Sequence, residues 1–263
     1  MTRSLAIAAA AALLAVPIVG TVPAAAERLV TSISRHQVMV NSSFAGTSIV
    51  LFGTVEPDTP TARRRATGYD LVVTVTGPRQ TIVERRKERV LGIWTNLGAR
   101  TFLNVPSYLA VLSNQPFEQI TNPETVRELQ LGLVDKVLPQ QLGNDVGDVV
   151  RDDPFRANFI RLKMQHQLYL QKTNGVTLLT PTVFRAEIPL PAEAPIGNYD
   201  VDVKVLADGA LLTRANSAFE IIKVGFEQFV ANAAQEYGLL YGITTAMMAI
   251  MTGWFAAVVF RRD

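Results

Sequence analysis

The carboxyl-terminal stretch 238–260 constrains this chain most, because its twenty-three residues carry no formal charge. A helix of that length covers about 34 Å at ~1.5 Å per residue. The hydrocarbon core of a bilayer is about 30 Å thick. The stretch therefore predicts a single transmembrane helix over 238–260, and the lipid bilayer is the first partner that the sequence implies.

The amino terminus predicts export from the cytoplasm. Arg3 is the first charge, residues 5–19 are apolar, and Ala24-Ala25-Ala26 precede Glu27. This is the layout of a secretory signal peptide over 1–26. A second membrane helix is the alternative, but about fifteen apolar residues are short for a span. The mature chain is expected to begin at Glu27.

The orientation follows from both ends of the chain. Arg261 and Arg262 directly follow the apolar stretch, and basic residues favour the cytoplasmic side of a membrane helix. A signal peptide sends the chain that follows it to the other side. We expect a bacterial inner-membrane, single-pass protein with its amino-terminal domain in the periplasm. A helical stalk is predicted at 227–237 and a cytoplasmic tail at 261–263.

Charge and cysteine content exclude several classes of function. Without Arg3, Arg261, Arg262 and Asp263, the chain has 22 basic and 22 acidic residues. A nucleic-acid-binding domain should show an excess of basic residues, so no nucleic-acid partner is predicted. The chain has no cysteine, which excludes thiol catalysis and cysteine metal sites.

The exported part predicts mainly β structure. Strands are expected at 28–40, 47–54, 69–76, 81–94, 101–105, 108–113, 176–179, 183–188, 199–206 and 218–224, with a turn at 96–98. In 199–206 apolar residues alternate with Asp200, Asp202 and Lys204, which indicates one buried and one solvent-facing side. Asp208-Gly209 is typical of a hairpin turn. Short strands at this spacing favour an immunoglobulin-like β-sandwich over 27–226.

Two helices are expected inside the sandwich, as an insertion at about 117–173. The first has Thr121 or Asn122 as its cap and Pro123 in its first turn, and should continue to about residue 137. A loop at 140–148 follows, and a second helix should run from 153 to about 171. The predicted fold class is therefore mainly β, with a two-helix insertion and a carboxyl-terminal transmembrane helix. Two small β domains that flank a helical linker are the alternative.

The sequence contains no catalytic motif that we recognise. The patterns G-x-S-x-G, S-x-x-K and H-E-x-x-H and a glycine-rich phosphate loop are all missing. His36 and His166 are the only histidines, and nothing in their spacing pairs them with a nucleophile. Asp200 and Asp202 fit a solvent-facing strand side better than a calcium site. We predict that the protein is not an enzyme and has no cofactor, catalytic residue or metal site.

Two candidate interaction surfaces stand out instead. The first is a face of the predicted membrane helix, because on a helical wheel its small residues fall within roughly 140°. The predicted packing face consists of Gly238, Gly242, Ala246, Ala249, Gly253 and Ala257. Small faces let membrane helices approach one another closely, although Gly and Ala are also common in membrane helices that pack against nothing.

The second candidate surface is cationic. Arg85, Arg86 and Lys87 lie on a predicted strand, and Trp94 follows them. Such residues could bind an acidic partner or lipid headgroups. The alternative is that these charges only protect a sheet edge from pairing, and Glu84 and Glu88 dilute the patch.

The segments RRKERVLGIWTN (85–96) and NVPSYLAVLSN (104–114), together with the signal peptide and terminal anchor, resemble an uncharacterised alphaproteobacterial family of transmembrane proteins. The resemblance covers the whole chain. It implies a signal peptide, a periplasmic domain and a carboxyl-terminal anchor. It implies no activity and transfers no catalytic residue.

The sequence thus predicts an accessory or assembly partner of a membrane protein, either a transporter or a second copy of this chain. The alternative is a periplasmic module that binds a small ligand or metal and is tethered near a transporter. A hydrolase that uses a serine with His36 or His166 is the weakest hypothesis.

Overall fold

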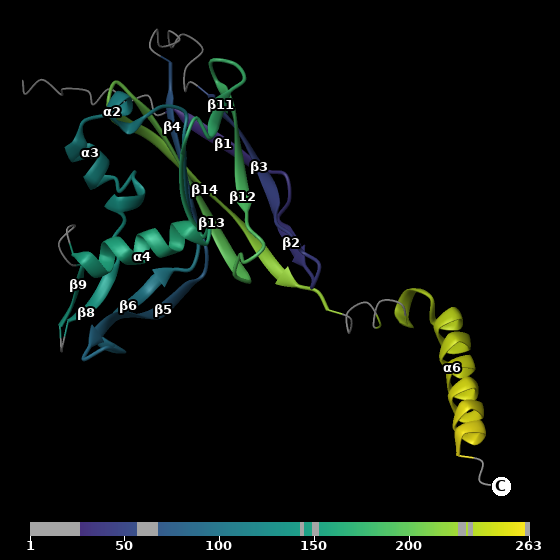
Figure 1. Ribbon diagram of the computed structural model, residues 1–263. Helices are drawn as coiled ribbons and strands as arrows, with labels where there is room; N and C mark the ends of the chain where they lie inside the picture. Colours follow the sequence, from purple (N-terminus) through teal and green to yellow (C-terminus); the bar gives the residue numbers. More distant parts are fainter. Residues whose placement is uncertain are drawn as a thin grey trace, which may run out of the picture.

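The computed structural model describes residues 27–56, 68–142, 145–148, 153–225, 230 and 234–260. The predicted signal peptide (1–26), part of the predicted stalk (227–237) and the tail (261–263) lie outside the described residues. The described chain is mainly β with one long helix near its carboxyl terminus (Figure 1), so the predicted fold class is confirmed at that level.

Two sheets form the body of the protein. The first sheet has the order β1-β3-β12-β11, with β1 Arg28–Ile33, β3 Thr47–Glu56, β12 Val183–Leu190 and β11 Val176–Leu178. The second sheet has the order β10-β7-β4-β13-β14-β2, with β10 Tyr169–Thr173, β7 Leu109–Ser113, β4 Asp70–Thr76, β13 Gly197–Ala207, β14 Ala210–Lys223 and β2 Gln37–Val40. Their facing sides share one buried apolar core.

Alternation along the strands decides which side chains enter this core. In β3, Ile49 and Leu51 are buried, and in β13 the predicted alternation buries Tyr199, Val201 and Val203. Successive strand residues point to opposite faces, so each strand contributes every second side chain. The sandwich is therefore built from the apolar half of each strand.

The order of the strands bears on the immunoglobulin-like prediction. Strands from both sides of 117–173 pair within both sheets, whereas two separate small β domains would not share sheets. The first sheet and the β4-β13-β14 centre of the second follow the connectivity of an immunoglobulin sandwich. The Tyr199 hydroxyl also donates to the Pro195 carbonyl at 2.7 Å, as in a tyrosine corner. The immunoglobulin-like assignment stays a prediction, which both features favour.

A further layer covers the outer face of the second sheet. It contains the third sheet, ordered β5-β6-β8-β9, with β5 Arg79–Val90, β6 Ile93–Pro106, β8 Pro139–Leu142 and β9 Asp145–Asp148. It also contains α2 Phe117–Ile120, α3 Pro123–Glu128, the 3-10 turn η1 Leu133–Asp135 and α4 Pro154–Gln165. A second apolar core lies beneath this layer. Strand β4 is buried on both faces, because Val73 enters the first core and Val72 the second.

The first inserted helix is shorter than predicted. Asn122 caps α3 through its side-chain oxygen, which accepts from the Thr125 amide at 2.8 Å, whereas the Thr121 hydroxyl donates to the Gly209 carbonyl. The helix ends at Glu128 and not near 137, because Gln130 adopts a left-handed φ of 49°, which an α-helix cannot continue.

The second inserted helix is also shorter than predicted, since α4 ends at Gln165 and not near 171. Gln167 has a φ of 56°, and residues Tyr169–Thr173 then pair with β7 as the parallel strand β10. Their apolar pattern serves a sheet and not a helix. The loop expected at 140–148 is the β8–β9 pair instead.

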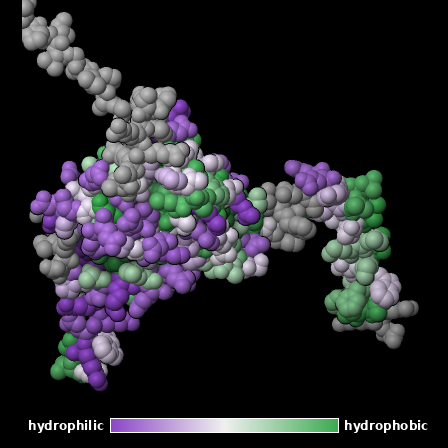
Figure 2. Space-filling model, turned by 90° about the horizontal axis from the view of Figure 1, so that it is seen from above, coloured by the Kyte–Doolittle hydropathy of each residue, from purple (hydrophilic) through white to green (hydrophobic). Residues whose placement is uncertain are grey.

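The predicted membrane helix is present as α6, Gly238–Val259. It is the one described helix that is long and apolar enough to cross a membrane, and none of its residues is buried in the protein. Figure 2 shows its hydrophobic surface as the green column at the right.

Candidate interaction surfaces on the hairpin and the membrane helix

The cationic surface predicted from the sequence lies on the β5–β6 hairpin, which reverses at Leu91 and Gly92. The turn predicted at 96–98 is wrong, because β6 passes through these residues with only a shift in register opposite Arg86 and Lys87. Leu91 and Gly92 have φ values of 49° and 86°, which a two-residue hairpin turn of the primed type requires.

The hairpin separates the predicted cations onto two faces. Arg85 and Lys87 share one side of β5 with Arg89, because strand side chains alternate. Arg86 is on the other side, where it forms an ion pair with Glu88 and its guanidinium lies 5.8 Å from the centre of the Phe155 ring. We call Arg85, Lys87 and Arg89 the cationic face; Glu88 does not dilute it.

Trp94 lies at the outer end of this cationic face. Its strand partner is Arg89, whereas Lys87 pairs with Asn96 and Arg85 with Ala99. Directly opposite residues of an antiparallel pair share one face of the sheet. The Arg89 guanidinium also donates to the Gly92 carbonyl at 3.2 Å, which ties it to the turn. Within the described part of the chain, Arg85 and Lys87 make no ion pair.

The end of the hairpin is apolar and exposed. Leu91 is 98% exposed, Ile93 68% and Trp94 67%, and Val90 beside them is also exposed. We call these four residues the hairpin tip. In Figure 2 the hairpin forms the narrow, mostly purple projection at the lower left, and green residues lie beside purple ones near its end. Apolar side chains are thus concentrated where they have least contact with the rest of the protein.

The inner face of the hairpin is fixed to α4. The Arg100 guanidinium lies 5.2 Å from the centre of the Phe155 ring, and its nitrogen is 3.9 Å from the Asp153 carboxylate. Glu84 pairs with Arg100 across the strands. Burial and the nearby Asp153 carboxylate raise the pKa of Glu84 to about 7, against the lowering effect of Arg161.

The small face of α6 is open along its length. All six residues predicted for it are exposed: Gly238, Gly242, Ala246, Ala249, Gly253 and Ala257. A Cβ added at any of the three glycines would meet nothing within 4 Å. The threonine hydroxyls on this side bond within the helix, Thr245 to the Tyr241 carbonyl at 3.0 Å and Thr252 to the Met248 carbonyl at 2.8 Å.

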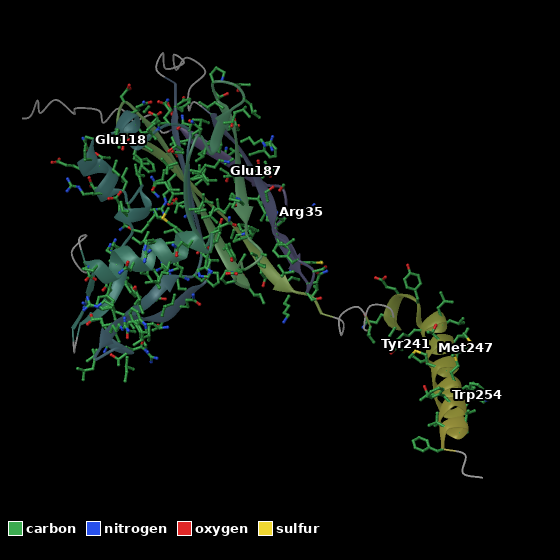
Figure 3. All side chains as sticks on the ribbon, viewed as in Figure 1. Arg35, Glu118, Glu187, Tyr241, Met247 and Trp254 are labelled. Carbon is green, nitrogen blue, oxygen red and sulfur yellow. The ribbon has the colours of Figure 1, made fainter. Side chains whose placement is uncertain are left out.

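The opposite side of α6 carries large side chains. Met247 and Trp254 are exposed and project outward from the helix (Figure 3). The helix therefore has one narrow face where a neighbouring backbone could come close and a wider face suited to lipid tails.

The described residues offer little for a metal or catalytic site. They contain no group of three His, Asp or Glu side chains that could hold a metal ion. His166 lies 3.3 Å from the Glu193 carboxylate on the surface, and Asp202 is paired with Lys204 and Arg214. Hollows of ≈ 710 and ≈ 660 Å³ flank Met164 beside α4.

The sequence prediction missed part of the hairpin surface. The sequence prediction gave no role to Leu91, Ile93 or Arg89. Gly92 could have revealed this surface from the sequence. A glycine at this position marks a hairpin reversal, which brings Trp94 back beside Arg89. Strand alternation would then have set Arg86 apart.

Comparisons with known proteins add the family. No curated protein matches the chain. Among solved structures, the N-terminal domain of the Streptococcus gordonii adhesin Sgo0707 matches with a TM-score of 0.26 and 7% identity. That match covers 74% of this chain and 32% of that one, about a third of its length. A likeness this weak says nothing about fold or function. The family model described as "Putative transmembrane protein (Alph_Pro_TM)" matches residues 28–262, and the chain therefore belongs to this alphaproteobacterial family.

Proposed function

We propose that this protein is a single-pass inner-membrane protein with a periplasmic sandwich, which serves without catalysis as an accessory or assembly partner. Its partner is another membrane protein, either a transporter or a second copy of this chain, and the contact is the small face of α6. Membrane anchoring itself follows from the family and from α6. The signal-peptide pattern at 1–26 and the basic tail support the orientation.

The open glycines carry this proposal. Gly242 and Gly253 have ordinary helical φ values and nothing above them. The fold of a single chain therefore gives no steric reason for glycine at these two positions. Close contact with a second helix does give a reason, since a small residue lets two backbones approach.

Crosslinking tests the proposal, and the absence of native cysteine makes every introduced cysteine unique. Gly242→Cys and Gly253→Cys should form crosslinks to another membrane helix in native membranes. Met247→Cys and Met251→Cys, at similar depths on the opposite face, are the matched controls and should not. Equal yields from the two faces would contradict the proposal.

The same variants also identify the partner. A crosslinked product of twice the mass of the chain indicates a second copy, and any other mass indicates a different membrane protein. The periplasmic ligand- or metal-binding alternative has less support. Arg156 and Arg161 line one of the hollows beside α4, but the described residues contain no group of three His, Asp or Glu side chains that could hold a metal ion.

A further inference from the structure

We propose that the tip of the β5–β6 hairpin is a second membrane contact, which inserts Leu91, Ile93 and Trp94 into the headgroup region of an anionic bilayer. This inference rests on membrane anchoring alone and not on the helix partner proposed above. The two can therefore fail separately.

The backbone of the turn gives the first argument. Leu91 has a φ of 49°, a region where asparagine and glycine are favoured and a leucine is strained. The same side chain is 98% exposed. A large apolar residue held in a strained turn with no contact in the fold is explained by a contact outside it.

The order of chemistry along the hairpin matches a bilayer. Leu91 is outermost, Trp94 follows, and Arg89 and Lys87 lie about 7 and 13 Å behind Leu91 at ~3.3 Å per residue. The headgroup layer on each side of the hydrocarbon core is about 5–8 Å thick. When the tip enters this layer, Arg89 comes level with the lipid phosphates and Lys87 lies just outside them. Tryptophan also favours this depth.

Charge complementarity selects the occupant. The cationic face contains Arg85, Lys87 and Arg89, whose charges attract anionic headgroups. A protein partner would need a broad complementary surface on this protein to bind. The tip is the convex end of a two-stranded ribbon, which suits insertion between headgroups better.

The topology brings this hairpin toward the membrane. Strands β4 and β14 are both antiparallel to β13, so they run in the same direction. The chain leaves β4 into β5, and it leaves β14 toward α6. The hairpin and the anchor therefore depart from the same end of the second sheet, the lower end in Figure 1.

The connection to the anchor leaves enough reach. Fourteen residues separate the end of β14 at Lys223 from the start of α6 at Gly238. They can span at most about 50 Å. The twelve residues of β5 extend about 40 Å. A hairpin of this length can therefore contact the bilayer while α6 spans it.

Trp94 reports on this contact directly. The chain has two tryptophans, so Trp254→Phe leaves Trp94 as the only one. The full-length protein would be reconstituted in phosphatidylcholine vesicles with or without phosphatidylglycerol. We expect brominated lipid to quench Trp94 emission, more strongly with phosphatidylglycerol and less at high salt. Trp94 that stays as accessible to acrylamide in anionic vesicles as in detergent would overturn the proposal and indicate a protein partner instead.

Leu91→Asn separates insertion from folding. Asparagine tolerates the left-handed turn, so this variant should unfold at the same or a higher denaturant concentration than the native chain. It should nevertheless reduce quenching of Trp94 by brominated lipid several-fold. Unchanged quenching would show that Leu91 does not insert.

A matched charge set tests the cationic face. Arg85, Lys87 and Arg89 changed to Gln should weaken the phosphatidylglycerol dependence, about fivefold in affinity for each charge removed. The control changes three exposed cations elsewhere to Gln: Arg28, Arg35 and Arg185. Figure 3 shows Arg35 on the side of the sandwich away from the hairpin. If both triple variants lost the same affinity for phosphatidylglycerol vesicles, only the net charge would matter. That result would overturn the assignment of this face.

Discussion

The two faces of the second sheet are packed in different ways. Toward the first sheet, β4 and β13 present only buried apolar side chains such as Val73 and Val203. Toward the helical layer, the same two strands present Thr74 and Lys204, both buried. One face is thus entirely apolar, whereas the other adds polar and charged groups to the second apolar core.

Hydrogen bonds on the helical side satisfy only some of the polar side chains that are buried there. The Arg156 guanidinium donates to the Val134 carbonyl at 3.1 Å and the Lys136 carbonyl at 2.6 Å. The Gln140 side chain and a Glu84 oxygen have no hydrogen-bond partner among the described residues. Because an unpaired buried polar group costs about 1–3 kcal/mol, the apolar face should supply most of the stability, and the helical face should make it sensitive to charge.

The largest effect is expected from Phe184→Ala, on the apolar side. Phe184 is fully buried in the first core and its ring occupies the space that Gly53 leaves open. Removing such a ring should lower the free energy of unfolding by about 3–5 kcal/mol. Denaturant unfolding of the full chain in detergent micelles, followed by circular dichroism, measures the change.

Phe52→Ala is the control, because Phe52 lies beside Gly53 in β3 but points to the exposed side of the same sheet. Its loss should cost less than about 1 kcal/mol. Similar losses from both phenylalanines would mean that the first core is not the main source of stability.

A smaller effect is expected from Asp202→Ala, on the helical side. The Asp202 carboxylate pairs with the buried Lys204 ammonium and, at 2.5 Å, with the Arg214 guanidinium. Removing one partner of a buried pair leaves an uncompensated charge. We expect a loss of about 2–4 kcal/mol, somewhat below the ~3–5 kcal/mol for fully buried pairs because Arg214 is exposed.

Lys204→Met gives the contrast that makes this prediction specific. Methionine replaces the buried charge with an apolar chain of similar length, which is often neutral or stabilising. The free energy of unfolding of Lys204→Met should stay within about 1 kcal/mol of that of the native protein or rise. Equal losses from both variants would indicate that packing, and not charge compensation, holds this region together.

Much of the sandwich could be predicted from the sequence because its strands follow local rules. The alternation from Tyr199 to Val203, the Asp208-Gly209 turn and the Asn122 cap are all short-range patterns, and the structure contains each of them. The helix limits could not be predicted in this way. Residues 169–173 have a pattern compatible with helix, and only pairing with β7, distant in sequence, makes them a strand.

The hairpin surface was predicted only in outline for the same kind of reason. The charges at Arg85, Arg86 and Lys87 are visible in the sequence, and strand alternation alone separates Arg86 from the other two. Which of the cations lies beside Trp94 depends on where the chain reverses. The left-handed φ of Leu91 has no sequence signature, since leucine is unusual in such a turn. The solvent-facing side predicted for β13 was also wrong at Lys204, because the helical layer covers it.

The smallest effect is expected from Glu84→Gln, and it depends on pH. Burial raises the pKa of Glu84 from 4.5 to about 7. Between these values the unfolded chain has lost this proton and the folded protein keeps it. Folded protein therefore binds more protons, and the free energy of unfolding should fall as pH rises from 4.5 to about 7. Above that pH the loss is complete.

Glutamine cannot ionise, so Glu84→Gln should remove this pH-dependent loss of stability. Because Glu84 is partly exposed and solvent screens its charge, we expect a gain of only about 1 kcal/mol in the free energy of unfolding at pH 7.5. Burial raises the pKa of Asp70 as well, so the difference between the two proteins, and not the native slope, isolates Glu84. Burial lowers the pKa of Lys136 to about 8, so this group titrates above the range from pH 4.5 to 7. Parallel unfolding curves for both proteins from pH 4.5 to 7 would show that the carboxyl is already ionised beside Arg100 and Arg161. The helical face would then be as insensitive to pH as the apolar one.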